Sequence, residues 1–215
     1  MFRLIVFDLD GTLVDSRRDI ADAANRLLRE CGADPLPDDR IGRMVGDGAA
    51  TLVARAFPAS GVEAPPDALE RFLSIYDRGL LNHTRTYDGI PDVLEALTPR
   101  AALAVLTNKP MAATRRVLDG LGLARFFHPD AVVAGDGPFP RKPDPAGLRH
   151  LAARAGISHG DTLLVGDSII DWRTARGAAA AICLARYGFG FEGFPMEELR
   201  PSDLIIETPR ALIAL

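Results

Sequence analysis

The sequence has little cysteine, few aromatic residues and no long hydrophobic run. Only two of its 215 residues are cysteines, Cys31 and Cys183, and they lie far apart in the chain. Such a sparse pair excludes a disulfide framework, and we expect both thiols to be free and buried. The four histidines have neither the spacing nor the neighbours of a metal site.

The apolar runs are too short to suggest a membrane or export segment. The first, MFRLIV, is shorter than a signal peptide requires and no small-residue cleavage site follows it; the longest later stretch, GAAAAICLA, cannot span a bilayer. A total of 25 basic and 29 acidic side chains gives a net charge of −4, with no basic run. We therefore expect a cytoplasmic protein that binds neither membranes nor nucleic acid.

Short apolar runs alternate with helical patterns along most of the chain. Continuous apolarity is typical of parallel strands that are buried on both faces, and the intervening helical patterns end near glycines. This alternation predicts a doubly wound, Rossmann-like α/β core with a parallel sheet. The expected strands are residues 4–7, 102–106, 131–134, 162–165, 181–185 and 204–206, and the clearest helices between them are residues 111–123, 145–156 and 168–180.

One long segment interrupts that alternation. Residues 16–84 contain no convincing strand but several amphipathic helical patterns. We therefore predict a helical domain over residues 16–84, inserted into a core made of residues 1–15 and 85–215. Two connecting segments, near residues 15–17 and 84–88, would let this domain move and gate access to the core.

Polar side chains follow four of the predicted strands. Because ligands of open α/β sheets bind beyond the carboxyl ends of the strands, we expect these side chains to converge. One hydroxyl, several cations and four carboxylates would meet there. They are Asp8 and Asp10 after the first strand, Thr107, Asn108 and Lys109 after the second, Arg141 and Lys142 after the third, and Asp167, Ser168 and Asp171 after the fourth.

Four carboxylates in one place require a counter-charge, because like charges and burial both disfavour ionisation. An all-oxygen set of ligands favours Mg²⁺, which in turn suits a phosphate substrate. We expect Asp8, Asp167 and the backbone carbonyl of Asp10 to bind the metal. Asp171 would be a further ligand or would orient the others.

The same residues suggest a division of catalytic roles. Asp8 can attack phosphorus to form an aspartyl-phosphate, while Asp10 protonates the leaving group and later activates water. Thr107 can donate a hydrogen bond to a phosphoryl oxygen, and Lys142 can supply fixed positive charge. Asn108 is either a substrate contact or a residue of the turn before the next helix.

Four motifs together resemble those of the haloacid dehalogenase superfamily of phosphohydrolases. They are FDLDGTLVDS, LTNKP, the lysine of RKPDP and VGDSIID, in the order and at the strand ends of that superfamily. The resemblance implies that the helical insertion is a cap that closes over the active site. The stretch IGRMVGDGAATLVARAF is similar to the cap segment of the phosphoglycolate phosphatase family, which implies substrate contacts from Arg43, Gly46 and Gly48.

Several functions remain as alternatives. Hydrolysis of 2-phosphoglycolate is the first hypothesis, and hydrolysis of a sugar phosphate, a nucleotide or pyrophosphate is the second. Gly166 disfavours a phosphosugar mutase, because that branch usually has glutamate there, and Asp10 disfavours a dehalogenase. A phosphate-binding protein without turnover is the non-enzymatic alternative. The sequence is compatible with a monomer or a homodimer.

Overall fold

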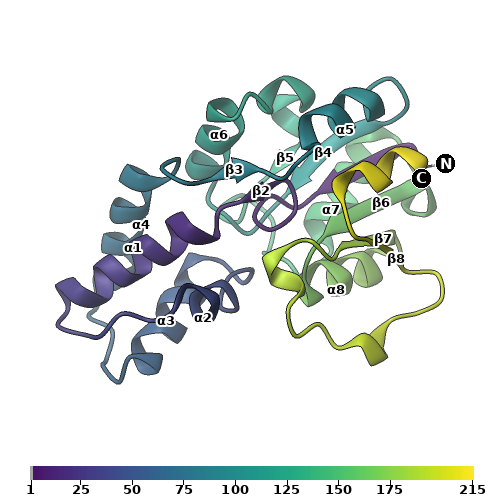
Figure 1. Ribbon diagram of the computed structural model, residues 1–215. Helices are drawn as coiled ribbons and strands as arrows, with labels where there is room; N and C mark the ends of the chain where they lie inside the picture. Colours follow the sequence, from purple (N-terminus) through teal and green to yellow (C-terminus); the bar gives the residue numbers. More distant parts are fainter. Residues whose placement is uncertain (1) are drawn as a thin grey trace.

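A six-stranded parallel sheet forms the centre of the protein. The computed structural model describes residues 2–215 (Figure 1). The strand order is β5-β4-β1-β6-β7-β8, and every neighbouring pair is parallel. The strands are β1 Leu4–Phe7, β4 Ala102–Leu106, β5 Val132–Val133, β6 Thr162–Gly166, β7 Ala181–Ala185 and β8 Leu204–Ile206.

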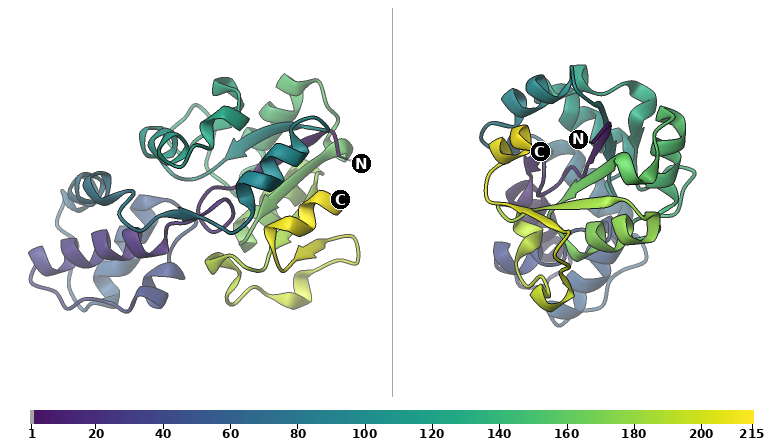
Figure 2. Two further views of the ribbon diagram at one scale, coloured as in Figure 1. Left: turned by 45° about the horizontal axis from the view of Figure 1, so that its top comes forward. Right: turned by 90° about the vertical axis from the view of Figure 1, so that its right-hand side faces the viewer.

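Helices cover both faces of this sheet (Figure 2). Alternate residues of β1 point to opposite faces, so Ile5 and Phe7 pack into one apolar core while Leu4 and Val6 pack into the other. The first core includes side chains of α5 (Ile90–Leu97) and α6 (Met111–Gly120), and the second includes those of α7 (Ala146–Ala155) and α8 (Ile169–Ala178). Both faces are therefore buried, which explains the continuous apolarity of the strands.

Four helices lie between the first strand and the rest of the core, to one side of the sheet (Figure 1). The chain enters and leaves them through two short strands that pair antiparallel, with Val14 opposite Thr86 and Asp15 opposite Arg85. We call these helices the cap; its predicted boundaries, residues 16 and 84, stay predictions. The cap helices are α1 Arg17–Glu30, α2 Asp38–Gly42, α3 Ala49–Ala59 and α4 Ala68–Gly79, and the connecting strands are β2 Val14–Asp15 and β3 Arg85–Thr86.

The sequence-based expectations for the core are largely confirmed. Six strands form where apolar runs predict them, although β5 is shorter than expected. Helices α2 and α5 and the β2–β3 pair were not anticipated. Both thiols are free, but Cys31 is only half-buried, whereas Cys183 is buried as predicted. The 3₁₀ helices are Ala124–Phe126, Pro129–Ala131, His159–Asp161, Phe189–Phe191, Met196–Glu198 and Pro209–Ala214.

No helix within residues 2–215 combines the length and the hydropathy that a bilayer crossing requires.

Candidate active site

The carboxyl ends of β1, β4 and β6 open into one cavity beneath the cap. Asp8 and Asp10 follow β1, Thr107 follows β4, and Asp167 follows β6. The register explains this convergence, because β1 pairs with β4 on one side and with β6 on the other. The cap contributes mainly apolar side chains to the opposite wall. They are Ile20, Val45, Ala49, Leu52, Phe72 and Leu73, together with the glycines Gly46 and Gly48 and the phenol of Tyr76.

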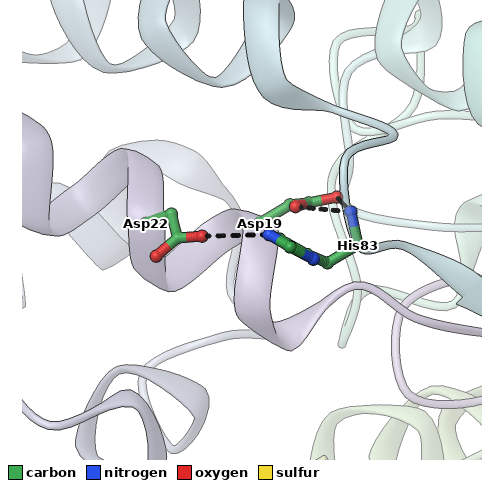
Figure 3. Close-up of side chains that lie close together, drawn as sticks. All are labelled: Asp19, Asp22 and His83. Carbon is green, nitrogen blue, oxygen red and sulfur yellow. Dashed lines mark hydrogen bonds and ion pairs between the residues drawn. The ribbon is translucent and has the colours of Figure 1, made fainter.

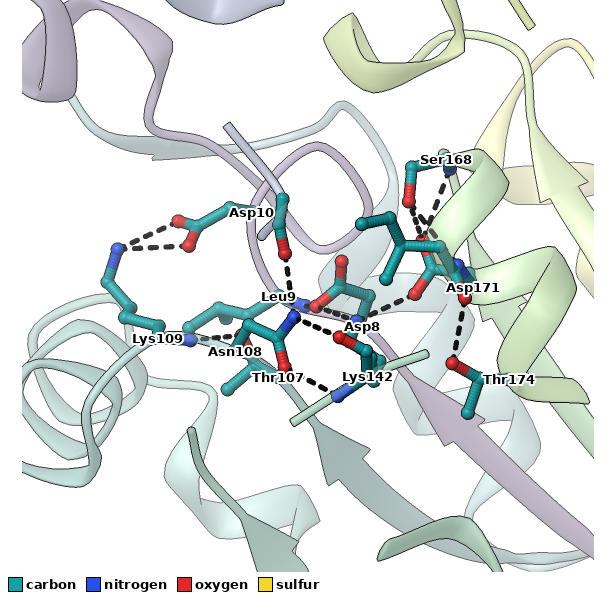
Figure 4. Close-up of polar contacts among 12 residues, drawn as sticks. Asp8, Leu9, Asp10, Thr107, Asn108, Lys109, Lys142, Ser168, Asp171 and Thr174 are labelled. Atoms are coloured by element: carbon teal, nitrogen blue, oxygen red, sulfur yellow. Dashed lines mark hydrogen bonds and ion pairs between the residues drawn. The ribbon is translucent and has the colours of Figure 1, made fainter. Parts of the chain in front are cut away.

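Asp8 is held in one orientation by two donors to the same oxygen. Its Oδ1 atom accepts a hydrogen bond from the backbone N–H of Leu9 at 2.7 Å and forms an ion pair with Lys142 Nζ at 2.8 Å (Figure 4). No donor among residues 2–215 contacts Oδ2. The side chain is therefore fixed while one carboxylate oxygen remains available for chemistry.

Lys142 joins two carboxylates from different elements, since Asp8 follows β1 and Asp171 lies in α8. Its Nζ atom lies 2.8 Å from Asp8 and 2.7 Å from Asp171, and the lysine side chain is only 2 % exposed. Burial disfavours the charged lysine, but the two carboxylates outweigh this effect and raise the Lys142 pKa. Asp171 is also fixed from the other side, since its Oδ2 accepts from the backbone N–H and the hydroxyl of Ser168 in a capping box.

Three carboxylates lie close enough to share one metal ion. Asp8, Asp167 and Asp171 each present an oxygen within 4.8 Å of the others, and all three are buried. Burial, with repulsion from Asp171, raises the pKa of Asp8 to about 7 despite Lys142, and the same two causes raise the pKa of Asp167 well above its usual value. The single positive charge of Lys142 does not balance the negative charge of the three carboxylates. The donor set therefore fits a hard divalent cation.

Asp167 is packed against backbone on three sides. A Cβ atom on Gly11 would lie 1.9 Å from Asp167 Oδ2, and Cβ atoms on Gly188 and Gly190 would also lie too close to this carboxylate. The backbone N–H of Gly190 donates to Oδ2 at 2.7 Å. Gly188 and Gly190 therefore help to position Asp167.

Asp10 points toward Lys109 and away from Asp8 and Asp171 (Figure 4). The Ser16 hydroxyl donates to its Oδ1 at 2.5 Å, and Lys109 Nζ lies 2.9 Å from Oδ1 and 3.1 Å from Oδ2. Ser16 occupies the N-cap position of α1 but makes no side-chain cap hydrogen bond, because its hydroxyl binds Asp10; Asp15 Oδ1 accepts from the N–H of Arg17 at 3.1 Å. The proposed acid and base is thus oriented by the connection into the cap.

Thr107 and Asn108 differ in their free hydrogen-bonding capacity. The Thr107 hydroxyl oxygen accepts from the N–H of Lys109 at 3.2 Å, which leaves its proton for a ligand. Both amide hydrogens of Asn108 are donated to protein carbonyls, those of Gly46 at 2.8 Å and Lys142 at 2.9 Å, and its Oδ1 accepts from the Lys142 N–H at 2.8 Å. Asn108 therefore connects the cap loop that contains Gly46 to the loop that contains Lys142. A contact between Asn108 and the substrate stays a prediction.

The predicted cap residues lie in two different places. Gly46 and Gly48 line the cavity, with φ angles of 119° and 92° that favour glycine. Arg43 does not line it, because its guanidinium pairs with Asp39 and with Glu192, each at 3.0 Å. A direct substrate contact from Arg43 has no support in this arrangement.

The sequence patterns assign no role to two residues of the site. They place Lys109 among the side chains at the strand ends without a function, and they do not distinguish Tyr76 from the core residues of its helix. The amino-acid composition could have drawn attention to Lys109, because Lys109 and Lys142 are the only lysines in the chain. Both are buried at the site. Tyr76 follows a helical pattern typical of an apolar core, so only the packing of α4 against the cavity reveals it.

A second acidic cluster connects the cap to its exit segment (Figure 3). Asp19, Asp22 and His83 lie close together, but the buried Asp19 carboxylate is already occupied. It accepts from the backbone N–H groups of His83 and Thr84 and from the Thr84 hydroxyl, at 2.7–3.0 Å. This cluster therefore fastens α1 to the segment that returns to the core.

Comparison with known proteins identifies the family of this chain. A model of the haloacid dehalogenase-like hydrolase family matches residues 5–185. The phosphoglycolate phosphatase of Rhodospirillum rubrum is 42 % identical over 89 % of this chain and 83 % of its own length, and that of Agrobacterium fabrum is 37 % identical over 97 % and 90 %. A crystal structure described as a predicted phosphoglycolate phosphatase from Haemophilus somnus aligns with a TM-score of 0.90 at 28 % identity, over 99 % of this chain and 97 % of that one. The family model covers most of the chain, and the relatives match it over most of their length. The chain therefore belongs to the haloacid dehalogenase-like hydrolase family.

Proposed function

We propose that this protein is a Mg²⁺-dependent phosphomonoester hydrolase that forms an aspartyl-phosphate on Asp8. The observation that carries this proposal is the fixed carboxylate of Asp8, which has one oxygen bound to Leu9 and Lys142 and the other free. A nucleophile needs such an orientation, because misplacement by about 1 Å can cost on the order of 10²-fold in rate. The neighbouring carboxylates and the lysine provide the charges that phosphoryl transfer requires.

In the first half-reaction, a carboxylate oxygen of Asp8 attacks phosphorus. A bond from that oxygen to phosphorus forms, the bond from phosphorus to the ester oxygen breaks, and Asp10 gives its proton to the departing alkoxide. Thr107 donates its free hydroxyl proton to a phosphoryl oxygen. The Lys142 ammonium, 2.8 Å from Asp8, stabilises the negative charge that accumulates on the transferred group.

In the second half-reaction, water attacks the aspartyl-phosphate. Asp10, now ionised, takes a proton from this water, and the bond between phosphorus and the Asp8 oxygen breaks to release inorganic phosphate. Lys109 and Ser16 hold the Asp10 carboxylate in place for both steps. The enzyme thus returns to its starting state without a further co-reactant.

The metal would be held by Asp8 and Asp167, with Asp171 and the backbone carbonyl of Asp10 as the remaining protein candidates. When bound, Mg²⁺ would neutralise carboxylate and phosphoryl charge. Asp171 already accepts from Lys142 and Ser168, so we assign it mainly to orienting the site.

We further propose that the substrate is 2-phosphoglycolate, which yields glycolate and phosphate. The support comes from the named relatives, at 42 % and 37 % identity, and from a cavity with few polar groups on its cap side. Another small phosphate ester is the alternative. A mutase-like glutamate at position 166 has no space, since even a Cβ atom there would lie 2.3 Å from Asp171 Cγ. The cytoplasmic location and the monomeric or homodimeric state stay predictions from sequence.

A substrate panel tests this proposal. Phosphate release is measured with purified protein on 2-phosphoglycolate, sugar phosphates, nucleotides and pyrophosphate, with Mg²⁺ and after its removal by a chelator. We expect 2-phosphoglycolate to have the highest kcat/KM and activity to return when Mg²⁺ is restored. A sugar phosphate that ranked far above it would overturn the substrate assignment, and full activity without divalent metal would overturn the assignment of the cofactor.

A further inference from the structure

Tyr76 brings a phenol from the cap into the catalytic cavity. It lies on α4, is 5 % exposed, and lines the same cavity as Asp10 and Lys109. The ring of Phe72 stacks against it, with centroids 5.9 Å apart and an interplanar angle of 10°. The orientation of the phenol is therefore fixed by packing and does not depend on a ligand.

The ammonium group of Lys109 contacts two partners within the protein, the Asp10 carboxylate and the Tyr76 hydroxyl. An ammonium group has three N–H donors. Lys109 Nζ lies 2.9 Å from Asp10 Oδ1, 3.1 Å from Asp10 Oδ2 and 2.6 Å from the hydroxyl oxygen of Tyr76. The tyrosine oxygen must consequently act as the acceptor in this contact, because the ammonium group has no acceptor capacity.

The single proton of the Tyr76 hydroxyl is then left without a partner. No residue in the part of the chain that the structure describes accepts a hydrogen bond from it. Burial raises the pKa of Tyr76 to about 12, so the phenol keeps this proton at neutral pH. A buried donor without an acceptor is costly, and the neighbouring Ile20, Leu52 and Leu73 offer none.

We propose that Tyr76 donates this hydrogen bond to the carboxylate of the substrate and thereby selects it. This inference rests on the proposed function. Asp10 is the proposed acid at the ester oxygen, and Lys109 contacts both Asp10 and Tyr76, so the phenol lies one side chain away from Asp10. In 2-phosphoglycolate the carboxylate carbon is only two bonds from the ester oxygen, so a substrate whose ester oxygen meets Asp10 keeps its carboxylate within the part of the cavity that Tyr76 lines.

The chemistry of the surroundings favours an anionic acceptor and a short leaving group. A lysine that donates to the tyrosine oxygen polarises the phenol and strengthens it as a donor. The apolar wall of Ile20, Leu52 and Leu73 has no partner for the several hydroxyls of a sugar. Unpaired buried hydroxyls reduce kcat/KM strongly, so the same wall disfavours sugar phosphates.

The test compares two substrates in Tyr76→Phe. The first is 2-phosphoglycolate and the second is ethyl phosphate, in which a methyl group replaces the carboxylate. We expect kcat/KM for 2-phosphoglycolate to fall by about 10- to 100-fold, the scale of a hydrogen bond to a charged group, while kcat/KM for ethyl phosphate changes less than about threefold. The inhibition constant of glycolate should rise by about tenfold or more in the variant.

Tyr187→Phe is the matched control. This phenol donates to the backbone carbonyl of Thr12 at 3.0 Å and does not line the cavity, so its loss should leave the ratio between the two substrates unchanged. Equal losses of kcat/KM on both substrates in Tyr76→Phe, or an unchanged glycolate inhibition constant, would overturn the role of Tyr76 but not the proposed function. A wild-type enzyme with no preference for 2-phosphoglycolate over ethyl phosphate would overturn the proposed substrate and this inference with it.

Discussion

The Nζ atom of Lys142 lies 2.8 Å from Oδ1 of Asp8, with the two side chains only 2 % and 9 % exposed. Replacement of Lys142 by methionine should lower kcat by about 10²- to 10³-fold, comparable with the loss of one preorganised donor. It should also destabilise the fold by about 3–5 kcal/mol, because buried carboxylates lose their cation. Phosphate release and urea unfolding measure the two effects. In Arg141→Met, at the exposed neighbouring position, both losses should be much smaller; equal losses would contradict the assignment.

Asp10 should matter most when the leaving group needs a proton. Asp10→Asn should reduce kcat on 2-phosphoglycolate by about 10²- to 10⁴-fold, the usual contribution of a general acid. With p-nitrophenyl phosphate the loss should be smaller, since its phenolate departs without protonation. The comparison of the two substrates in steady-state assays checks this. The same fold-loss on both would show that Asp10 does not act as the acid.

Gly166 is required by the packing of Asp171. A Cβ atom at position 166 would lie 2.3 Å from Asp171 Cγ, so Gly166→Ala should displace this carboxylate from Lys142. We expect a loss of about 1–3 kcal/mol in the free energy of unfolding, typical of an overpacked core, and a lower kcat. Gly160→Ala is the control, because the nearest atom to its Cβ would be 3.9 Å away. Similar stability of the two variants would refute this account.

Asp203 should make the fold sensitive to acid. Burial raises its pKa, but hydrogen bonds from the Arg200 N–H, Trp172 and Arg176 outweigh burial, so the net pKa is lowered. Its stabilising contribution is therefore complete above the unfolded pKa of about 3.9 and is lost as pH falls through the lower folded value. The stability difference between wild type and Asp203→Asn, from urea unfolding, should be present at pH 7 and shrink below pH of about 4. A difference that grew on acidification would contradict this sign.

Much of the core could be predicted from sequence because its signals are local. Apolar runs such as residues 102–106 and 162–165 mark buried strands, and polar residues directly after them must lie at the carboxyl edge of a parallel sheet. The positions of Asp8, Thr107 and Asp167 follow from this rule alone. The short helix α5 could also have been predicted, because its buried residues Ile90, Val93, Leu94 and Leu97 have helical spacing and Pro91 lies in its first turn.

The cap contacts could not be predicted because they depend on how distant segments pack. Whether Arg43 reaches the cavity or pairs with Glu192 depends on the loop of residues 186–193, which is far away in sequence. The occupied amide of Asn108 likewise depends on Gly46 and Lys142 arriving at one place. Tyr76 has the spacing of a core residue, and only its contact with Lys109 distinguishes it.

The central claim is the covalent intermediate on Asp8, and acid-quenched labelling tests it most directly. The enzyme is mixed with ³²P-labelled 2-phosphoglycolate and quenched in acid within one turnover, and the labelled peptide is identified. We expect label on the peptide that contains Asp8, release of that label by hydroxylamine, and neither label nor activity in Asp8→Asn. Wild-type phosphate release from Asp8→Asn, or label retained on a peptide without Asp8, would contradict the account.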